Sequence, residues 1–159
     1  MRALYYRILL GGFVTISLVL SPMAALAQPA TPAATPGMVD LGVLASGYGK
    51  PTAINNHGQV VGQSSAGGLA AHAFFWEKGV MTDLGTLGGL FSSAADINDD
   101  GQVVGYSYTK AEAGASAEVH AALWDGGVVS DLGHLGGGYS EAVDINAGGQ
   151  IVGMSATTG

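Results

Sequence analysis

The sequence predicts an all-β protein made of tandem four-stranded repeats of the propeller-blade type. Three observations support this fold class. The same motifs recur after 43 and again after 48 residues, a period typical of propeller blades. Glycine is abundant, with 27 residues against 5 prolines and only 11% charged residues, which indicates many tight turns and disfavours a helical bundle. Short β-branched segments alternate with Asn, Asp and Gly, as strands and hairpin turns require.

The first 27 residues have the features of an export signal. Arg2 and Arg7 form a basic flank, residues 8–20 are apolar and uncharged, and Pro22 ends the run. Ala25 and Ala27 are the small residues that signal peptidase requires, so we expect cleavage after Ala27 and a secreted or cell-surface protein. An uncleaved membrane anchor is the alternative, since residues 8–27 carry no charge over about the length of a bilayer span.

The mature part divides into a linker and a repeat domain. Residues 28–37 form a Pro/Thr-rich linker, and residues 38–159 contain about two and a half repeats. Beyond residue 27 the chain has three lysines against twelve acidic residues, which disfavours nucleic acid as a partner because phosphate binding requires a basic surface. Cysteine is absent, which excludes disulfides and thiolate chemistry. We expect no membrane insertion after signal cleavage.

The repeats are defined by three blocks at nearly constant spacing. Asp-Leu-Gly occurs at residues 40–42, 83–85 and 131–133. A second block begins with Ile-Asn and continues with Gly-Gln, two β-branched residues, Gly and Ser. It occupies residues 54–64, 97–107 and 145–155. His-Ala-x-x-Trp occurs at residues 72–76 and 120–124. The five additional residues of the second repeat lie between Ser107 and His120, which predicts an exposed loop there.

Each complete repeat carries signals for two hairpins. Asn-rich and Gly-rich turns follow Ile54, Ile97 and Ile145, and short turns at residues 77–79 and 125–127 follow the two Trp-containing strands. The aromatic residues Phe74, Phe75, Trp76 and Trp124 stand in mid-strand and are expected in the core.

The third copy stops before its His-Ala-x-x-Trp block, whereas a propeller ring needs about four to eight blades. Three arrangements follow from this count. The chain is a piece of a longer array, or a homo-oligomer completes the ring, or the repeats close a pseudo-threefold β-trefoil-like barrel. We also expect residues 39–44 to pair with residues 142–155, which would supply part of the third unit.

These motifs together resemble the HAF family of bacterial probable extracellular repeat proteins. The family is named after a His-Ala-Phe triplet, present here as His72, Ala73 and Phe74, and the resemblance covers residues 40–155. Two departures occur: residues 43–46 are Val-Leu-Ala-Ser where the other copies have Leu-Gly-Gly, and Ala122 replaces the expected Phe. The resemblance implies export and a repetitive β fold, and it implies no particular activity.

One loop has a partial metal-binding pattern. Asp96, Asn98 and Asp100 place oxygen atoms at alternate positions, as in the first half of a calcium loop. Position twelve of such a loop is Ser107 where a bidentate Glu is required. We therefore interpret the three residues as hairpin-turn residues and expect no cofactor, with calcium as the weaker alternative.

The histidines favour structural roles. His72 and His120 each precede a Trp by four residues on the same face of a strand, so we expect them to hydrogen-bond within the sheet. His57 and His134 stand in loops and are expected to be solvated. Asp83 and Asp131 are the candidates for a glycosidase acid pair, but their fixed place in the repeat, shared with Asp40, favours a turn or cap.

The preferred function is a non-catalytic interaction module whose ligand is an extracellular glycan or protein. The ligand surface is expected on Tyr48, Phe91 and Tyr139, which follow each Asp-Leu-Gly block, and on the loop that begins at Tyr108. The alternative is a fragment of an extracytoplasmic hydrolase built on a β-propeller, in which Asp83 and Asp131 would carry catalysis. The sequence contains no serine-hydrolase elbow, phosphate-binding loop or His-Glu-x-x-His helix that would specify another chemistry.

Overall fold

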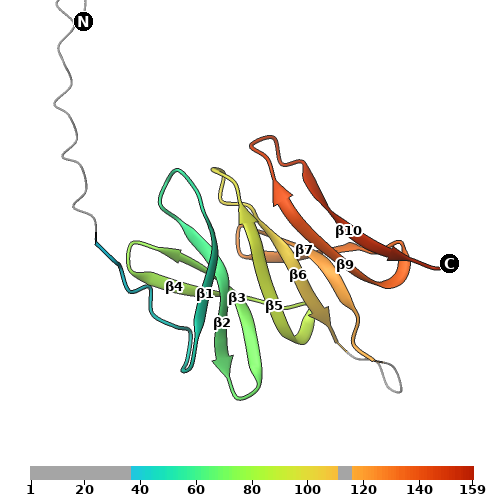
Figure 1. Ribbon diagram of the computed structural model, residues 1–159, viewed down its shortest axis with the longest axis horizontal. Coiled ribbons are helices and arrows are strands. Elements are labelled where there is room, and N and C mark those ends of the chain that lie inside the picture. The colour runs from blue at the N-terminus through green and yellow to red at the C-terminus, as the bar shows by residue number, and fades with distance from the viewer. Residues whose placement is uncertain (1–36, 111–115) are drawn as a thin grey trace, which may run out of the picture. The chain divides into compact units, whose positions relative to one another are not determined.

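The computed structural model describes residues 37–110 and 116–159, in which the compact unit runs from Met38 to Gly159 (Figure 1). The expected export segment and residues 28–36 of the linker lie outside the described residues. The described part is all-β, without a helix. Its ten strands are β1 (Gly49–Ile54), β2 (Val60–Gly67), β3 (Ala70–Glu77), β4 (Val80–Gly85), β5 (Gly88–Ile97), β6 (Val103–Thr109), β7 (Val119–Asp125), β8 (Val128–Gly133), β9 (Gly136–Ile145) and β10 (Ile151–Thr157).

The strands follow the sequence repeats. Strands β1 to β4 form an antiparallel meander, the first repeat, and β5 to β8 form an equivalent second repeat. The third repeat consists of the antiparallel pair β9 and β10. Single parallel pairings, Ala71 with Phe91 and Val119 with Tyr139, connect the repeats into one open ten-stranded sheet. The prediction of an all-β protein is therefore confirmed.

Both predicted kinds of hairpin turn are present. In the first kind, Asn98 N donates to Gln102 O and Gly101 N donates to Asn98 O, each at 3.1 Å, and the same bonds recur in the other two copies. Gly101 has a φ of 82°, a left-handed conformation that glycine adopts without steric cost. In the second kind, Gly126 and Gly127 have φ values of 56° and 84°, as a two-residue turn between twisted strands requires.

One glycine of each repeat is required by close packing. Gly62, Gly105 and Gly153 lie in the second strand, beside a register shift in the first strand. A Cβ atom at Gly105 would overlap the carbonyl oxygen of Ser93, and the other two glycines are blocked in the same way. The repeated Val-Val-Gly pattern thus encodes a β-bulge, where the neighbouring backbone leaves no room for a side chain.

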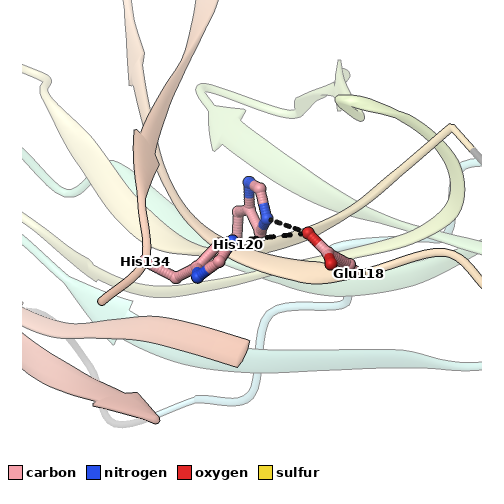
Figure 2. Close-up of side chains that lie close together, drawn as sticks. All are labelled: Glu118, His120 and His134. Carbon is pink, nitrogen blue, oxygen red and sulfur yellow. Dashed lines mark hydrogen bonds and ion pairs between the residues drawn. The ribbon is translucent and has the colours of Figure 1, made fainter. Parts of the chain in front are cut away.

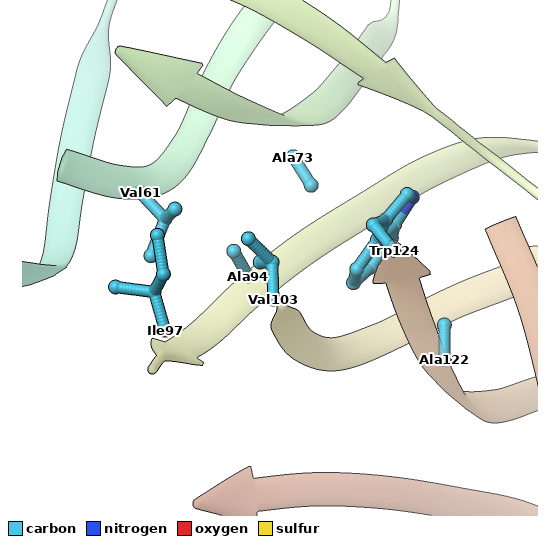
Figure 3. Close-up of a cluster of buried hydrophobic side chains, with 7 residues drawn as sticks. All are labelled: Val61, Ala73, Ala94, Ile97, Val103, Ala122 and Trp124. Carbon is cyan, nitrogen blue, oxygen red and sulfur yellow. The ribbon is translucent and has the colours of Figure 1, made fainter. Parts of the chain in front are cut away.

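The main core lies between the first and second repeats, at a position that we call the first joint (Figure 3). Trp124 of β7 is 2% exposed and packs with residues from both repeats. Phe74 is fully buried as well, so the prediction that these two aromatic residues belong to the core is confirmed, whereas Phe75 and Trp76 are only partly buried. The residues of the cluster are Val61, Ala73, Ala94, Ile97, Val103, Ala122 and Trp124.

The second joint, between the second and third repeats, uses the same repeat positions. Its buried residues are Val104, Ala121, Ala142 and Ile145, with Ile151 packed against them. Counted along the repeat, they correspond to Val61, Ala73, Ala94, Ile97 and Val103 of the first joint. The counterparts of Ala122 and Trp124 are missing, because no third strand follows β10 in the described residues.

Buried serines and asparagines join the repeats by hydrogen bonds. Ser92 Oγ accepts a hydrogen bond from Ala73 N at 2.9 Å and donates one to Gly85 O at 2.7 Å. Ser140 makes the same two bonds to Ala121 and Gly133, at 2.8 and 2.5 Å. A buried hydroxyl that both donates and accepts a hydrogen bond carries little desolvation cost. Removing it would leave buried backbone groups unpaired.

The asparagines of the turns form a ladder. Asn55 Nδ2 donates to Asn98 O at 3.0 Å, and Asn98 Nδ2 donates to Asn146 O at 3.2 Å. Each Asn side chain also binds the Gln four residues later. The Ile-Asn block therefore both closes its own turn and holds the next repeat.

The segment before β1 repeats the end of a complete unit. Leu44 N donates to Ser64 Oγ at 3.0 Å, as Leu87 N does to Ser107 Oγ at 2.8 Å. The expected pairing of residues 39–44 with residues 142–155 is wrong, because Leu44 and Ala45 bond to Ser64 and Ser65 of β2, and β10 pairs with β9 alone among the described strands. Closing a short loop costs less entropy than joining distant segments.

Candidate functional site

The aromatic residues predicted to bind a ligand belong to one connected group. Tyr48, Phe91 and Tyr139 occupy the same repeat position, and Phe91 contacts Tyr108 edge-to-face with ring centroids 5.4 Å apart. Tyr106 lies 6.5 Å from Tyr108. Tyr48 bonds to Gln63 and Tyr139 bonds to Glu141, and both of these partners line one groove together with Tyr106. We call these five residues the aromatic row.

The pKa values of Tyr106 and Tyr139 are raised by their surroundings. Burial raises the pKa of Tyr106, and the neighbouring Tyr108 and Glu141 raise it further. Tyr139 Oη donates to Glu141 Oε2 at 2.7 Å, and this bond raises the pKa of Tyr139 to about 12. Both hydroxyl groups are therefore neutral hydrogen-bonding groups at physiological pH.

Hydrogen-bonding side chains lie beside the row. A groove of about 230 Å³ is lined by polar atoms of Lys50, Gln63, Ser93 and Glu141, with Tyr106 at its side. Tyr48 Oη donates to Gln63 Oε1 at 3.0 Å, and Gln63 Nε2 donates to Ser92 O at 3.1 Å. Apolar ring surface next to a few oriented polar groups is the usual composition of a small-ligand site.

The loop with the calcium-like pattern uses its polar atoms within the protein. Asp96 Oδ2 accepts a hydrogen bond from Ile145 N at 3.0 Å, across the second joint. Asn98 is buried, and its side chain binds Gln102 and Asn146. Asp100 is exposed at the turn. These contacts agree with the interpretation as turn residues, and calcium binding stays a prediction.

A His-Asp pair occurs in each complete repeat. His72 Nδ1 lies 2.8 Å from Asp83 Oδ2, and His120 Nδ1 lies 2.7 Å from Asp131 Oδ2. In both pairs the aspartate also accepts a hydrogen bond from the backbone N–H two residues later, at 2.8 and 2.7 Å. The prediction that the two histidines hydrogen-bond within their sheet is confirmed. Because each aspartate serves its own histidine and turn, this geometry does not resemble two acids that flank one substrate.

The second repeat adds two groups to its pair (Figure 2). Glu118 Oε2 lies 3.1 Å from His120 Nε2 and 3.4 Å from His134 Nε2. Burial lowers the pKa of His120, but hydrogen bonds to Asp131 and Glu118 outweigh it and raise the pKa above its usual 6.5. Burial raises the pKa of Asp131, but the hydrogen bonds from His120 and Gly133 N and the nearby histidines together outweigh burial and lower it. We call Glu118, His120, Asp131 and His134 the ion cluster.

The spacing of Glu118, His120 and His134 is short enough for one metal ion to contact all three. The hydrogen bonds of His134 oppose this arrangement. His134 Nδ1 accepts a hydrogen bond from Gly136 N at 2.8 Å, so the proton of the neutral ring is on Nε2, which faces Glu118. A metal at Nε2 would require the other tautomer and the loss of the Gly136 bond. The residues therefore fit a hydrogen-bonded ion cluster better than a metal centre.

Sequence reasoning missed four residues of these sites, and one of them is Tyr106 of the aromatic row, which drew no prediction. The expectation that His134 is solvated is wrong, since its side chain is 22% exposed and bonded on both sides. Glu118 and Glu141 drew no prediction. An alignment of the repeats could have revealed Glu118 and His134, because they replace Ala70 and Thr86 of the first repeat. Residues 111–115 of the loop expected to bind ligand lie outside the described part of the chain.

Comparisons with models of known protein families, with curated proteins and with solved structures gave no match. The resemblance to HAF repeats therefore depends on the motifs of the sequence alone. The described part of the chain contains no apolar helix of membrane-spanning length.

Proposed function

We propose that this chain is a secreted or cell-surface β-repeat scaffold that binds an extracellular glycan without catalysis. The observation that carries the proposal is the aromatic row, in which Phe91, Tyr108 and Tyr106 are in contact and Tyr48 and Tyr139 bond to residues that line one groove with Tyr106. Tyr48 and Tyr139 are 50% and 39% exposed, so their rings are open to a ligand.

The chemistry of the row favours carbohydrate over other ligands. Sugar rings present apolar C–H faces and hydroxyl groups, and the row offers aromatic faces beside the amide of Gln63 and the carboxylate of Glu141. The excess of acidic residues opposes anionic ligands. A neutral oligosaccharide that lies across several repeats is therefore the ligand class that we expect.

The repeat architecture supports the remaining parts of the proposal. Four-stranded antiparallel meanders that follow one another are the units of a β-propeller, and we assign the chain to that fold and to the HAF repeats. The basic flank, apolar run and small residues at positions 1–27 support export of the domain from the cytoplasm. A repeated surface of this kind suits weak contacts that add up over several sites.

Glycan-array binding of the purified protein tests this function. The Tyr48→Ala, Tyr139→Ala double variant should bind at least about tenfold more weakly, because each truncated contact costs about 1 to 2 kcal/mol and 1.4 kcal/mol is tenfold. Its melting temperature should change little, since both rings are largely exposed. The Val80→Ala, Val128→Ala variant is the matched control, because it removes exposed apolar side chains from β4 and β8.

Two results would contradict the proposal. One is the absence of any glycan signal above background for the unmodified protein. The other is an equal loss of binding in the control variant. Turnover of chromogenic glycosides that an Asp83→Asn, Asp131→Asn variant abolishes would instead identify a hydrolase.

A further inference from the structure

The ring of His134 fixes the backbone segment that leads into Tyr139 of the aromatic row. Its Nδ1 accepts hydrogen bonds from Gly136 N at 2.8 Å and from Gly138 N at 3.3 Å. Gly138, the residue before Tyr139, has a φ of 68°, a left-handed conformation that needs such support less often in other residue types because they avoid it. Since the neutral imidazole accepts through one nitrogen alone, both backbone bonds depend on an unprotonated Nδ1.

The other side of the ring reaches the strand that pairs with Tyr139. His134 Nε2 lies 3.4 Å from Glu118 Oε2, and Glu118 directly precedes Val119. Val119 and Tyr139 form the parallel pairing between the second and third repeats. His134 therefore contacts the chain immediately before both partners of this pairing.

The first repeat has the same turn without a titratable group. Thr86 Oγ1 accepts a hydrogen bond from Gly88 N at 3.1 Å and donates one to Gly89 O at 2.8 Å. Phe91 follows at the repeat position of Tyr139. A hydroxyl does not change its charge in the pH range in which histidine does, so the segment before Phe91 is held independently of pH.

Protonation of His134 would reverse the role of its Nδ1. An imidazolium donates from both nitrogens, so the new Nδ1–H would face the N–H groups of Gly136 and Gly138. The bond from Nε2–H to Glu118 would strengthen at the same time, because a charged donor binds a carboxylate more strongly than a neutral one. Acidification therefore keeps the ring at Glu118 and releases the glycine segment.

Three carboxylates and one imidazole face His134. Glu118 is its bonded partner, Asp131 interacts with it electrostatically, and Glu141 of β9 lines the same groove. The ring of His120 lies 4.8 Å away, centroid to centroid. Strand β10 contains no titratable residue. The carboxylates favour a protonated His134, and a charged His120 opposes it.

We infer that His134 is a pH-sensitive switch of ligand binding at the aromatic row, which holds Tyr139 in place at neutral pH and releases it on acidification. The effect on affinity rests on the proposed glycan-binding function, whereas the movement of Tyr139 depends on the hydrogen bonds alone. The segments before Tyr48 and Phe91 contain no histidine, so these two rings keep their positions. The protein should thus bind a glycan at neutral pH and release it in an acidified medium.

An NMR titration of the purified protein tests the switch without a ligand, over about pH 8 to pH 5, where histidine generally titrates. The amides of Gly136 and Gly138 and the ring of Tyr139 should shift with one midpoint, which is that of the His134 ring itself. The amide of Gly88, which binds a threonine hydroxyl, should not follow this midpoint.

Binding to a glycan selected on the array tests the effect on affinity. From about pH 7.5 to pH 5 the affinity should fall roughly three- to tenfold, the factor that corresponds to the net contribution of one hydrogen bond.

Matched variants assign this pH dependence to His134. His134→Thr installs the acceptor that Thr86 supplies in the first repeat, and it should bind with the same affinity at both pH values. His57→Thr, at an exposed turn, is the control and should keep the full pH dependence. Should His134→Thr fail to fold by circular dichroism, Glu118→Gln provides a second test. It should move the NMR midpoint to lower pH, because it removes a carboxylate that stabilises the imidazolium.

The inference is overturned if the Gly138 amide and the Tyr139 ring do not titrate with His134, or if His134→Thr binds glycan with an unchanged pH dependence. Absence of glycan binding at every pH would contradict the proposed function, and the NMR titration would then decide the switch by itself.

Discussion

The first and second joints use the same repeat positions but differ in what stabilises them. The first joint is apolar and closed, because Ala122 and Trp124 complete its cluster. The second joint has a smaller apolar cluster, and the ion cluster stands beside it, where the first repeat has Ala70 and Thr86. Thr86 Oγ1 accepts the turn hydrogen bond from Gly88 N, and His134 Nδ1 accepts the equivalent bond from Gly136 N. The comparison shows that one backbone geometry accommodates either a His-Asp pair alone or a pair extended by Glu118 and His134.

The largest expected difference between the joints comes from Trp124. Trp124→Ala should destabilise the protein by about 3 to 5 kcal/mol, because it leaves a cavity in the first joint. Urea denaturation followed by circular dichroism measures the loss. Trp124→Phe should cost much less, since it keeps most of the ring and removes an indole N–H that has no hydrogen-bond acceptor among the described residues. Equal losses for Ala and Phe would contradict the packing explanation.

A smaller difference in stability is expected between substitutions of Val104 and Val152, which occupy the same repeat position. Val104→Ala should destabilise by roughly 1 to 3 kcal/mol, because Val104 is fully buried in the second joint. Val152→Ala should change stability by no more than about 0.5 kcal/mol, as at other exposed positions. The same denaturation experiment compares them. If both substitutions cost the same, the third repeat is covered in solution.

The smallest expected effect is a pH dependence confined to the second joint. The pKa of His120 is raised in the folded state, so its contribution is fully present below the usual 6.5 and is lost as pH rises through the folded pKa. Because the pKa of Asp131 is lowered, its contribution is present above the usual 3.8 and is lost as pH falls through the folded value.

We expect the stability difference between the unmodified protein and a His120→Gln variant to shrink between pH 6 and pH 9. The difference should stay below about 1 kcal/mol, since the carboxylates of the ion cluster are open to solvent. Melting curves at a series of pH values measure it. Glu118→Gln should reduce the pH dependence in part. A difference that does not vary with pH would show that His120 acts through packing alone.

Much of the fold was predictable, because each local signal recurs in several copies. The turns after Ile54, Ile97 and Ile145 and the short strands between them follow from Asn, Gly and β-branched residues at fixed places. The pairing expected for residues 39–44 was wrong, because a count of strands does not say which edges meet. Residues 44 and 45 bond to the neighbouring strand β2 instead.

The sites were predictable only where the repeat position itself carried the signal. Tyr48, Phe91 and Tyr139 could be selected because they are aromatic at one position. Tyr106 and Glu141 became neighbours of that row only through strand pairing. The ion cluster was missed because its parts come from β7, from the turn after β8 and from residue 118, which are separated by up to 16 positions in the sequence.

The bulge glycine has a consequence for any attempt to lengthen or recombine this array. Gly62, Gly105 and Gly153 stand in strands whose neighbouring residues vary, yet each faces a carbonyl group that excludes even a methyl group. A library of shuffled repeats can vary the following residue without loss of the bulge, since Gln63, Tyr106 and Met154 stand there. The glycine must be held constant. Copies of the repeat that lose it would be eliminated when such a library is selected for function.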